Sequence, residues 1–346
     1  MGVCAIVSFR LGLSDGVSVV AALWAKAIDD MGWTTYTVAG EGPVDRVVPG
    51  LAIDATEPPT FDELHAALAE ADIVLVENIL SIPMNLPASQ VLAEVLAGRP
   101  ALLHHHDPPW QRERFAHITE LPPDDPKWRH VTINRMTERQ FTERGIATQT
   151  IYNGFDPNPP TGDRESTRRW LGLRSDDLLL AHPVRAIARK NIPKAIQLAE
   201  ALDATYWLPG DAEEGYGQEL ERILDGANCE VLRKPLSGSG YDINDLYAAC
   251  DLVVFPSTWE GFGNPPIEAA LHRRLAAVGS YPVADELRAL GFQWFDPDDA
   301  DTIASALQRW PDEILDRNQQ LAREHLSVER MAREVARLFT EAGWTP

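Results

Sequence analysis

Short apolar runs alternate with segments of helical periodicity through the first half of the chain. The strand-like runs fall at 3–9, 34–38, 73–76, 101–105 and 131–133. Between them, apolar residues recur at helical spacing in 17–31, 61–70, 86–97 and 136–144. Strands that alternate with helices in this way predict a parallel sheet with helices packed on it.

The second half repeats this rhythm. Its strand-like runs are 178–181, 205–208, 230–232, 252–255 and 275–278, and the tail at about 300–342 is helical by pattern. Prolines and a glycine crowd the aperiodic stretch 157–162, which is typical of a linker. A chain of 346 residues can hold two domains that each bury a core. The pattern therefore predicts an α/β protein made of two Rossmann-like halves.

The charge of the chain narrows the classes of partner. Lysine and arginine together number 31, against 52 aspartates and glutamates, which gives a net charge of −21. Such a field repels nucleic acid and anionic membrane surfaces, so any phosphate site must be local. We expect no nucleic-acid partner and no stable membrane association.

Cysteine usage and the apolar segments bear on the compartment. Cys4, Cys229 and Cys250 have no paired or metal-type spacing, which suits a reducing compartment better than a disulfide framework. The first apolar run is too short for a signal peptide, and no segment approaches the roughly 18 apolar residues of a membrane span. The expected location is the cytoplasm.

The most informative stretch is W-E-G-F-G-N-P-P-I-E, which follows the apolar run 252–255. Two prolines there open a predicted helix, whose N-terminus offers N–H groups to an anion, and Gly261 and Gly263 let the backbone approach a ligand. Glu260 and Glu268 flank this phosphate-side site. Since carboxylates repel phosphate, they are suited to accept hydrogen bonds from hydroxyls, and a nucleotide sugar offers hydroxyls on both sides of its phosphates. The spacing alone fits an ordinary turn with two solvated glutamates equally well.

Two further clusters end predicted strands. The segment L-L-H-H-H-D-P-P-W places three histidines at 104–106, but side chains alternate along a strand, so at most two could reach one metal ion, and we predict no metal site. Arg185 and Lys190, separated by four residues, follow the strand at 178–181, where such charges are usually only solvated. The dinucleotide fingerprint G-x-G-x-x-G is absent after the first strand, which weakens a dehydrogenase interpretation.

The nine residues E-G-F-G-N-P-P-I-E resemble the E-x7-E signature of family-four retaining glycosyltransferases of the GT-B fold. That resemblance implies two Rossmann-like domains with parallel sheets facing each other across a cleft. Residues 1–158 would form the acceptor domain and 159–327 the nucleotide-sugar donor domain. The last helix, in about 328–346, would pack back onto the acceptor domain.

The resemblance also implies roles for single residues. His106, with His105 as the rival, would contact the sugar, and Arg185 and Lys190 would grip the donor diphosphate, with Arg189 able to replace either. With Glu260, these make His106, Arg185 and Lys190 the implied catalytic residues. The implied donor-binding residues are Gly16, Leu232, Arg233, Glu260, Gly261, Phe262, Gly263, Asn264, Pro265 and Glu268.

The sequence departs from the family pattern at three points. Asp15 precedes Gly16 where many relatives have a second glycine, and His182-Pro183 stands where relatives tend to carry a glycine before the arginine. Tyr281 lies in G-S-Y-P-V, which replaces a frequent double glycine.

The function implied is transfer of a hexosyl group from a nucleotide-diphosphate sugar to a soluble small acceptor, with retained configuration and with neither metal nor cofactor. The alternatives are a GT-B nucleotide-sugar epimerase, a sucrose-synthase-like enzyme and, from another class, a nucleotide-sugar-binding regulator without turnover. The donor base, the sugar, the acceptor and the oligomeric state stay open.

Overall fold

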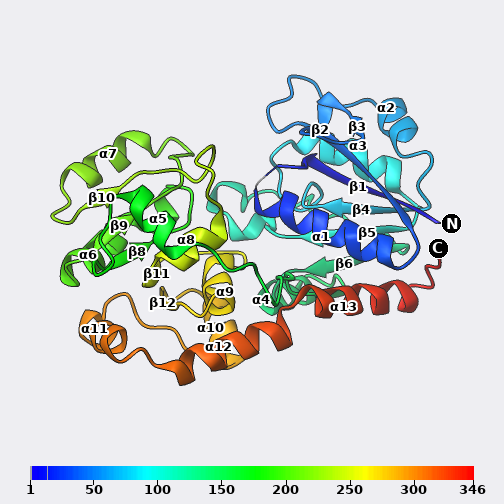
Figure 1. The fold of residues 1–346 in the computed structure, drawn as a ribbon. Helices are drawn as coiled ribbons and strands as arrows, with labels where there is room; N and C mark the ends of the chain where they lie inside the picture. Colours follow the sequence, from blue (N-terminus) through cyan, green and yellow to red (C-terminus); the bar gives the residue numbers. More distant parts are fainter. Residues whose placement is uncertain (1, 14) are drawn as a thin grey trace. The chain divides into compact units, whose positions relative to one another are not determined.

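The residues that the computed structural model describes, 2–13 and 15–346, form two parallel sheets with helices packed on them (Figure 1). The larger sheet has the strand order β3-β2-β1-β4-β5-β6-β7. Its strands are β1 (Val3–Arg10), β2 (Thr34–Glu41), β3 (Arg46–Val47), β4 (Ile73–Glu77), β5 (Ala101–His105), β6 (Trp128–Thr132) and β7 (Thr148–Thr150). All of these neighbours pair in parallel, as the alternating pattern predicts.

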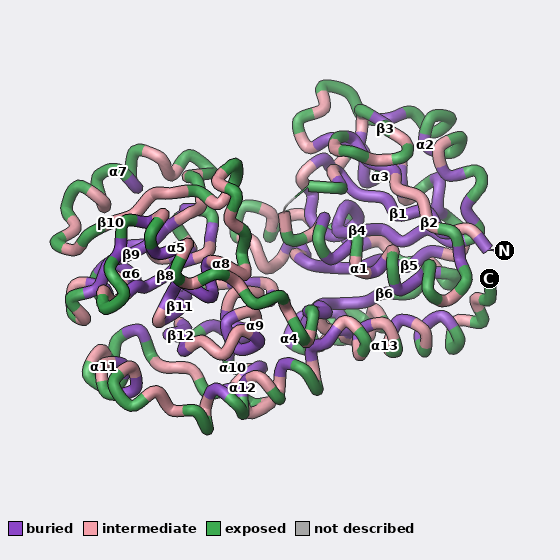
Figure 2. Tube along the Cα trace, in the orientation of Figure 1, coloured by how far each residue is buried: buried purple, intermediate pink, exposed green. Residues whose placement is uncertain are grey.

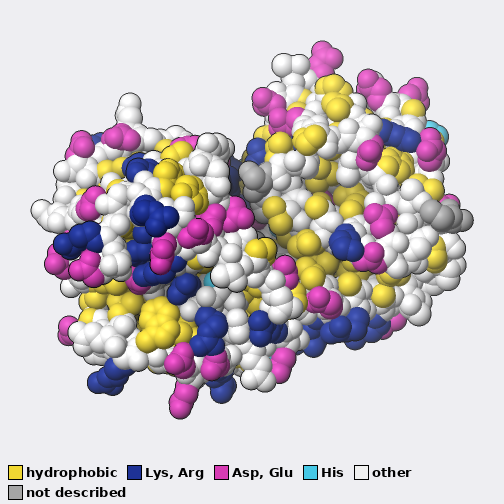
Figure 3. Space-filling model, viewed as in Figure 1, with side chains coloured by type: hydrophobic (Ala, Val, Ile, Leu, Met, Phe, Trp, Pro, Cys, Tyr) yellow, Lys and Arg dark blue, Asp and Glu magenta, His cyan; other side chains and the backbone are white. Residues whose placement is uncertain are grey.

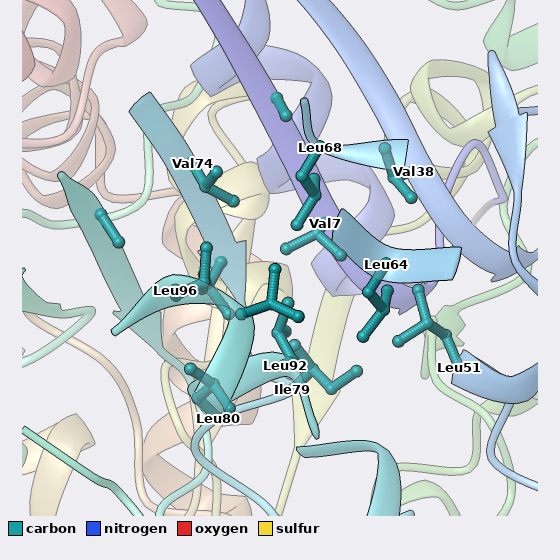
Figure 4. Packing of buried hydrophobic residues seen from close by; sticks show 14 of the residues in the cluster. Val7, Val38, Leu51, Leu64, Leu68, Val74, Ile79, Leu80, Leu92 and Leu96 are labelled. Carbon is teal, nitrogen blue, oxygen red and sulfur yellow. The ribbon is translucent and has the colours of Figure 1, made fainter. Parts of the chain in front are cut away.

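The two faces of this sheet bury separate cores, because successive side chains of a strand point to opposite sides. Ala5 and Val7 of β1 pack with α2 (Phe61–Ala67) and α3 (Leu86–Leu96), in the core shown in Figure 4. Cys4 and Ile6 instead join the core formed with α1 (Gly16–Asp30) and α13 (Val328–Glu341). The helix α4 (Arg135–Glu143) lies against β6 and β7.

The smaller sheet has the strand order β10-β9-β8-β11-β12, again with parallel pairing. Its strands are β8 (Leu179–Ala181), β9 (Thr205–Trp207), β10 (Val231–Leu232), β11 (Leu252–Phe255) and β12 (Leu275–Val278). Its helices are α5 (Arg164–Leu171), α6 (Ile192–Ala201), α7 (Gly217–Asp225), α8 (Ile243–Ala249), α9 (Asn264–Leu271), α10 (Pro282–Ala289), α11 (Ala300–Arg309) and α12 (Asp312–His325). The inner strands of each sheet are mostly buried, whereas β3, β7 and β10 at the edges contain no buried residue. Exposure is concentrated in loops and outer helix faces (Figure 2).

Contacts divide the chain into two units. One unit comprises Met1–Gly154 and Val328–Pro346, and the other comprises Phe155–Ser327. The chain leaves the first unit at Gly154 and returns at Val328. A Cβ on Gly154 would lie 2.9 Å from the Cα of Val328, so the glycine permits the close approach of the leaving and returning segments. From there α13 packs against α1 within the first unit.

The structure differs from the predicted elements in several places. β3 and β7 were not expected, and the strand predicted at 131–133 is Trp128–Thr132. The helical tail is divided into α11, α12 and α13, with a break at Trp310, whose φ of 47° is left-handed, and at Pro311. None of the helices in the described residues is long and apolar enough to span a bilayer.

Candidate functional site

The segment after β11 is held tightly by its neighbours. β11 is fully buried between β8 and β12 in the smaller sheet, and two prolines occupy the first turn of α9, where a missing N–H costs no helical hydrogen bond. Gly263 caps this helix with a φ of 94°, and a Cβ there would stand 2.3 Å from the Tyr281 Oη atom. Only glycine therefore fits between the turn and Tyr281.

Glu260 lies in this turn, only 6% exposed, with a cation on each carboxylate oxygen. Lys190 Nζ donates to Oε1 at 2.6 Å, and an Arg189 guanidinium nitrogen donates to Oε2 at 2.5 Å. Lys190 also sits over the ring of Phe255, the last residue of β11, at 4.9 Å. Burial lowers the pKa of Lys190 to about 8, although the Glu260 charge opposes the shift.

Backbone contacts bring the two cations to the glutamate. The amide of Thr258 donates to the Arg189 carbonyl at 2.9 Å, and the Asn191 side chain donates to the Pro256 carbonyl at 3.3 Å. Asn191 has a left-handed φ of 53°, which ends the short turn Ala188–Lys190 and starts α6. The loop after β8 is thereby fastened to the loop after β11.

The structure separates the predicted pair Arg185 and Lys190. Lys190 is buried against Glu260, whereas Arg185 is 44% exposed and pairs with Glu213 at 2.6 Å. The second cation on Glu260 is Arg189, which the sequence offered only as a substitute. At the His182-Pro183 departure, His182 is fully buried with its Nδ1 atom 2.8 Å from Tyr206 Oη, and burial, together with the Lys190 charge, lowers its pKa to about 3.

Glu268 lies on α9 and is partly buried. The Tyr247 hydroxyl donates to Glu268 Oε2 at 2.5 Å, and burial raises the pKa of this carboxyl. His272 stacks on the Tyr247 ring at 4.9 Å, and burial lowers the pKa of His272 to about 4. Tyr247 is a site residue that no sequence motif indicated.

The other predicted donor residues of this unit occupy the same edge of the sheet. Leu232 ends β10 and pairs with Trp207, and Arg233 donates to the Gly210 carbonyl at 3.0 Å. Gly261 and Phe262 continue the turn from Glu260, with Phe262 buried against the Phe155 ring. Asn264 and Pro265 are the first residues of α9. The carboxyl ends of parallel strands are where ligands bind in open α/β sheets.

In the N-terminal unit, His105 and His106 have different surroundings. His105 is fully buried, with Nδ1 2.5 Å from Ser81 Oγ and Nε2 2.9 Å from His130 Nδ1. His106 lies on the opposite side of the strand, with Nε2 2.9 Å from Glu77 Oε2. His105 is thus a packing residue, while His106 keeps 7% of its side chain exposed.

His104 and His106 converge on the same buried carboxylate, as strand alternation permits. His104 Nδ1 lies 3.1 Å from Glu77 Oε1, and one ligand atom from each of the three residues lies within 4.8 Å of the others. The prediction that at most two histidines converge agrees with this arrangement, but no sequence motif indicated Glu77 as their shared partner. What could have indicated Glu77 is its place at the end of β4, where it is in register with His104 of β5.

The predicted loop 10–16 contains Ser14, which lies outside the described residues. Gly16 starts α1, and the preceding Asp15 caps the helix by accepting from the amides of Val17 and Ser18 at 3.2 and 3.3 Å. The Asp15 carboxylate therefore occupies the N-terminus that a glycine at this position would leave open.

Known proteins resemble part of the second unit and most of the whole chain. Residues 186–312 match the family "Glycosyl transferases group 1", a range that includes Lys190, Glu260 and Glu268. The mannosylglucosylglycerate synthase of Thermotoga maritima is 26% identical over 348 residues, which cover 81% of each chain. The enzyme of the same name from Petrotoga mobilis is 24% identical, covering 83% of this chain and 85% of its own.

Solved structures share the fold. HepE of Anabaena, in complex with UDP and glucose, superimposes with a TM-score of 0.76 at 19% identity, covering 99% of this chain and all of its own. The sucrose-phosphate synthase of Thermosynechococcus elongatus gives a TM-score of 0.71 at 14% identity, covering 99% of both chains. The chain has the GT-B fold of these structures, and its E-x7-E segment lies inside the residues that match the glycosyltransferase family.

Proposed function

We propose that the protein is a retaining hexosyltransferase that moves a hexosyl group from a nucleotide-diphosphate sugar to a small soluble acceptor, without a metal ion. The observation that carries the proposal is the cluster of Arg189, Lys190 and Glu260, which lies at the carboxyl end of β11 and β8 beside the start of α9. Such a cluster offers fixed positive charge and a helix N-terminus to a diphosphate.

The C-terminal unit would bind the donor through its diphosphate and through its nucleoside. Lys190, Arg185 and Arg189 would hold the diphosphate, with Arg185 turning from its exposed partner Glu213. Glu268, held by Tyr247, would accept hydrogen bonds from the ribose hydroxyls, and the backbone of Leu232 and Arg233 would contact the base. Gly261, Phe262, Gly263, Asn264 and Pro265 would line the sugar and phosphate with main-chain groups. The complexes of HepE with UDP and UDP-glucose support a uridine or similar diphosphate donor.

The N-terminal unit would supply the acceptor side. There, we propose that residues 1–158 bind the acceptor, that the loop before Gly16 contributes to the site, and that His106 contacts the transferred sugar, as the family resemblance implies. A small acceptor is supported by the name of the Thermotoga and Petrotoga relatives, whose product is a glycosylated glycerate.

In the reaction, the bond between the anomeric carbon and the diphosphate oxygen breaks as the acceptor oxygen attacks on the same face. The acceptor proton passes to the departing phosphate, which assists the attack. Lys190 and Arg185 stabilise the charge that develops on this leaving group. Glu260 is not the nucleophile, since cations engage both of its oxygens.

Thermal shift against UDP, GDP, ADP and NAD tests the donor class, because a ligand that binds only the folded protein raises its melting temperature. One of the nucleoside diphosphates should stabilise the protein and NAD should not. The matching nucleotide sugars, incubated with small hydroxyl acceptors in EDTA, should then give a product one hexose heavier with the donor's anomeric configuration.

Three outcomes would contradict the proposal. These are stabilisation by NAD alone, inversion of the anomeric configuration, and a strict requirement for Mg²⁺ or Mn²⁺. Stabilisation by a nucleotide sugar with no transfer to any acceptor would instead favour a binding regulator. Arg222→Ala, which removes an exposed arginine paired with Glu219, is the control for nonspecific loss of charge in this unit.

A further inference from the structure

Glu77 is a fully buried carboxylate that the proposed reaction does not itself require. It ends β4 and is 0% exposed. Each of its oxygens faces a different imidazole nitrogen, Nδ1 of His104 at 3.1 Å and Nε2 of His106 at 2.9 Å. Burial raises the pKa of Glu77, but the charges and hydrogen bonds of the two histidines outweigh it and lower that pKa to about 2.

An ionised carboxylate only accepts hydrogen bonds, so each facing nitrogen must carry the proton. Whenever the ring of His106 carries a single proton, that proton is therefore on Nε2, and Nδ1 keeps a lone pair. Within residues 2–13 and 15–346, His106 Nδ1 makes no hydrogen bond, and the side chain is 7% exposed. The ring is thus held on one side and able to accept from a ligand on the other.

The end of β4 also fixes the backbone of this histidine. The Asn78 side-chain oxygen accepts from the amides of His106 and Asp107, both at 3.1 Å. Asn78 has a left-handed φ of 62°, and its own amide donates to the His104 carbonyl at 3.0 Å. Trp24 packs on the His104 ring with centroids 4.4 Å apart, which closes the other side of the cluster. Both the main chain and the ring of His106 are therefore set by its neighbours.

We propose that Glu77 is a positioning residue for His106, which it holds in the Nε2–H form so that Nδ1 accepts a hydrogen bond from a hydroxyl of the sugar. This inference rests on the proposed glycosyl transfer and on the role of His106 in it. His104 is the second ring on the same carboxylate and prevents Glu77 from turning away, because moving either oxygen would leave a buried N–H without its acceptor.

A divalent cation between Glu77, His104 and His106 is the competing explanation, since their ligand atoms lie within 4.8 Å of one another. The nitrogen to oxygen distances of 2.9 and 3.1 Å are those of direct hydrogen bonds. They are shorter than the roughly 3.3 Å between ligands of a tetrahedral zinc site with bonds of about 2.0 Å. His104 Nε2 also has no partner in the described residues, whereas a metal-bound histidine is normally oriented by one.

The first experiment is an NMR spectrum of the ligand-free wild-type protein labelled with ¹⁵N-histidine. The protonation of His106 is thereby measured in the unchanged protein. The spectrum should show His106 protonated on Nε2 and unprotonated on Nδ1, with the signals assigned by their loss in His106→Gln. A wild-type His106 protonated on Nδ1 instead would overturn the proposal. One equivalent of Zn²⁺ that binds these rings and is needed for turnover would also overturn it.

Glu77→Gln then removes one of the two acceptors with little change in shape, because an amide has one oxygen and one NH₂. His106 should lose its single protonated form, and kcat should fall roughly 10- to 100-fold, the loss expected for a charged hydrogen bond. The affinity for the nucleoside diphosphate, which binds the other unit in our proposal, should stay unchanged.

Ser81→Ala is the matched control, since it removes one of the two polar partners of the neighbouring buried histidine, His105. It should lower the melting temperature while leaving the His106 spectrum and kcat as in the wild type. Unchanged kcat in Glu77→Gln would contradict only the positioning role of Glu77 and not the proposed function. Absence of any transfer by the wild type, with the expected His106 spectrum, would instead contradict the proposed function.

Discussion

Two cations, Arg189 and Lys190, meet at Glu260, and both are more deeply buried than Arg185. Removing one member of a buried ion pair leaves an uncompensated charge, so a substitution at Lys190 or Arg189 would disturb folding as well as the proposed binding. Arg185 pairs with Glu213 at the surface, where an ion pair contributes little to stability. A substitution at Arg185 therefore separates the proposed role in catalysis from folding.

We predict that Arg185→Ala folds with an unchanged melting temperature and transfers sugar with kcat reduced roughly 10²- to 10³-fold. This is the usual cost of losing one preorganised group that stabilises developing charge. Steady-state kinetics at saturating donor, beside thermal unfolding of the same samples, measure both quantities. Near-wild-type turnover would remove Arg185 from the leaving-group site.

The lowered pKa of Lys190 predicts opposite pH dependences for binding and stability. The groups that affect its charge are Glu260, Arg189 and Arg185. Its pKa is about 8 in the folded protein and 10.5 ordinarily, so between these values the unfolded chain binds more protons and this group's contribution to stability rises with pH. Affinity for a diphosphate should fall over the same range, because the cation that binds it is lost.

Calorimetry on the ligand-free protein should therefore find the nucleoside diphosphate bound roughly five- to tenfold more weakly at pH 9 than at pH 7.5. Lys190→Arg, which stays charged, should show a much flatter dependence. Equal slopes in the two proteins would assign the pH effect to another group.

Glu268 gives a separate test of the ribose contact. Glu268→Gln should weaken nucleoside diphosphate binding by about 1–3 kcal/mol, the order of a hydrogen bond to a charged group. The loss should vanish for a ligand without the ribose, such as pyrophosphate, which serves as the control. Unchanged affinity for the nucleoside diphosphate would exclude this contact.

At the scale of elements, the apolar pattern predicts the buried strands best. Strands of a parallel sheet covered on both faces contain continuous apolar runs, and β5, β11 and β12 have the predicted bounds. β7 was not predicted by this criterion, because Thr148–Thr150 is polar and only three residues long. β6 begins at Trp128, before its apolar residues, since pairing with β5 extends it.

The site was predictable only as far as local motifs carry it. The turn after β11 and the positions of Glu260 and Glu268 follow from sequence, because glycine and proline set the local backbone. Glu77 and Tyr247 contact their partners through strand or helix packing between segments more than 20 residues apart, which no local pattern encodes. Arg189, rather than Arg185, lies with Lys190 beside Glu260, and this depends on the short turn Ala188–Lys190.

The helix α13 contributes an apolar face to the first unit although it follows the second unit in sequence. Leu338 is 4% exposed in the core shared with α1. We predict that Leu338→Ala lowers the free energy of unfolding by about 2–5 kcal/mol through lost burial and the cavity it leaves. Denaturant unfolding measures this, with the exposed Arg337→Ala as control, and a loss equal to that of the control would contradict the packing described here.

At the scale of the molecule, acidic and basic side chains are interspersed on the visible surface of both units (Figure 3). On this face (Figure 3) the acidic side chains lie on both units rather than in one place. Lys26 is the only basic residue of α1 and pairs with Asp30 at 2.8 Å. On α13, Arg330 and Arg337 each pair with a glutamate four residues on, at 3.1 and 3.6 Å.

This charge distribution leads to the prediction that the protein does not bind anionic vesicles at physiological salt. A juxtaposed basic residue contributes about 1 kcal/mol of attraction to an anionic surface, so several unpaired ones must lie together for stable binding. Here acidic neighbours pair with Lys26 of α1 and with Arg330 and Arg337 of α13, and the net charge adds repulsion. Sedimentation with vesicles containing phosphatidylserine should leave the protein in the supernatant, with a polybasic protein as positive control. Strong co-sedimentation that falls with salt would show that a basic face has been overlooked, and a membrane-bound acceptor would then replace the small soluble one.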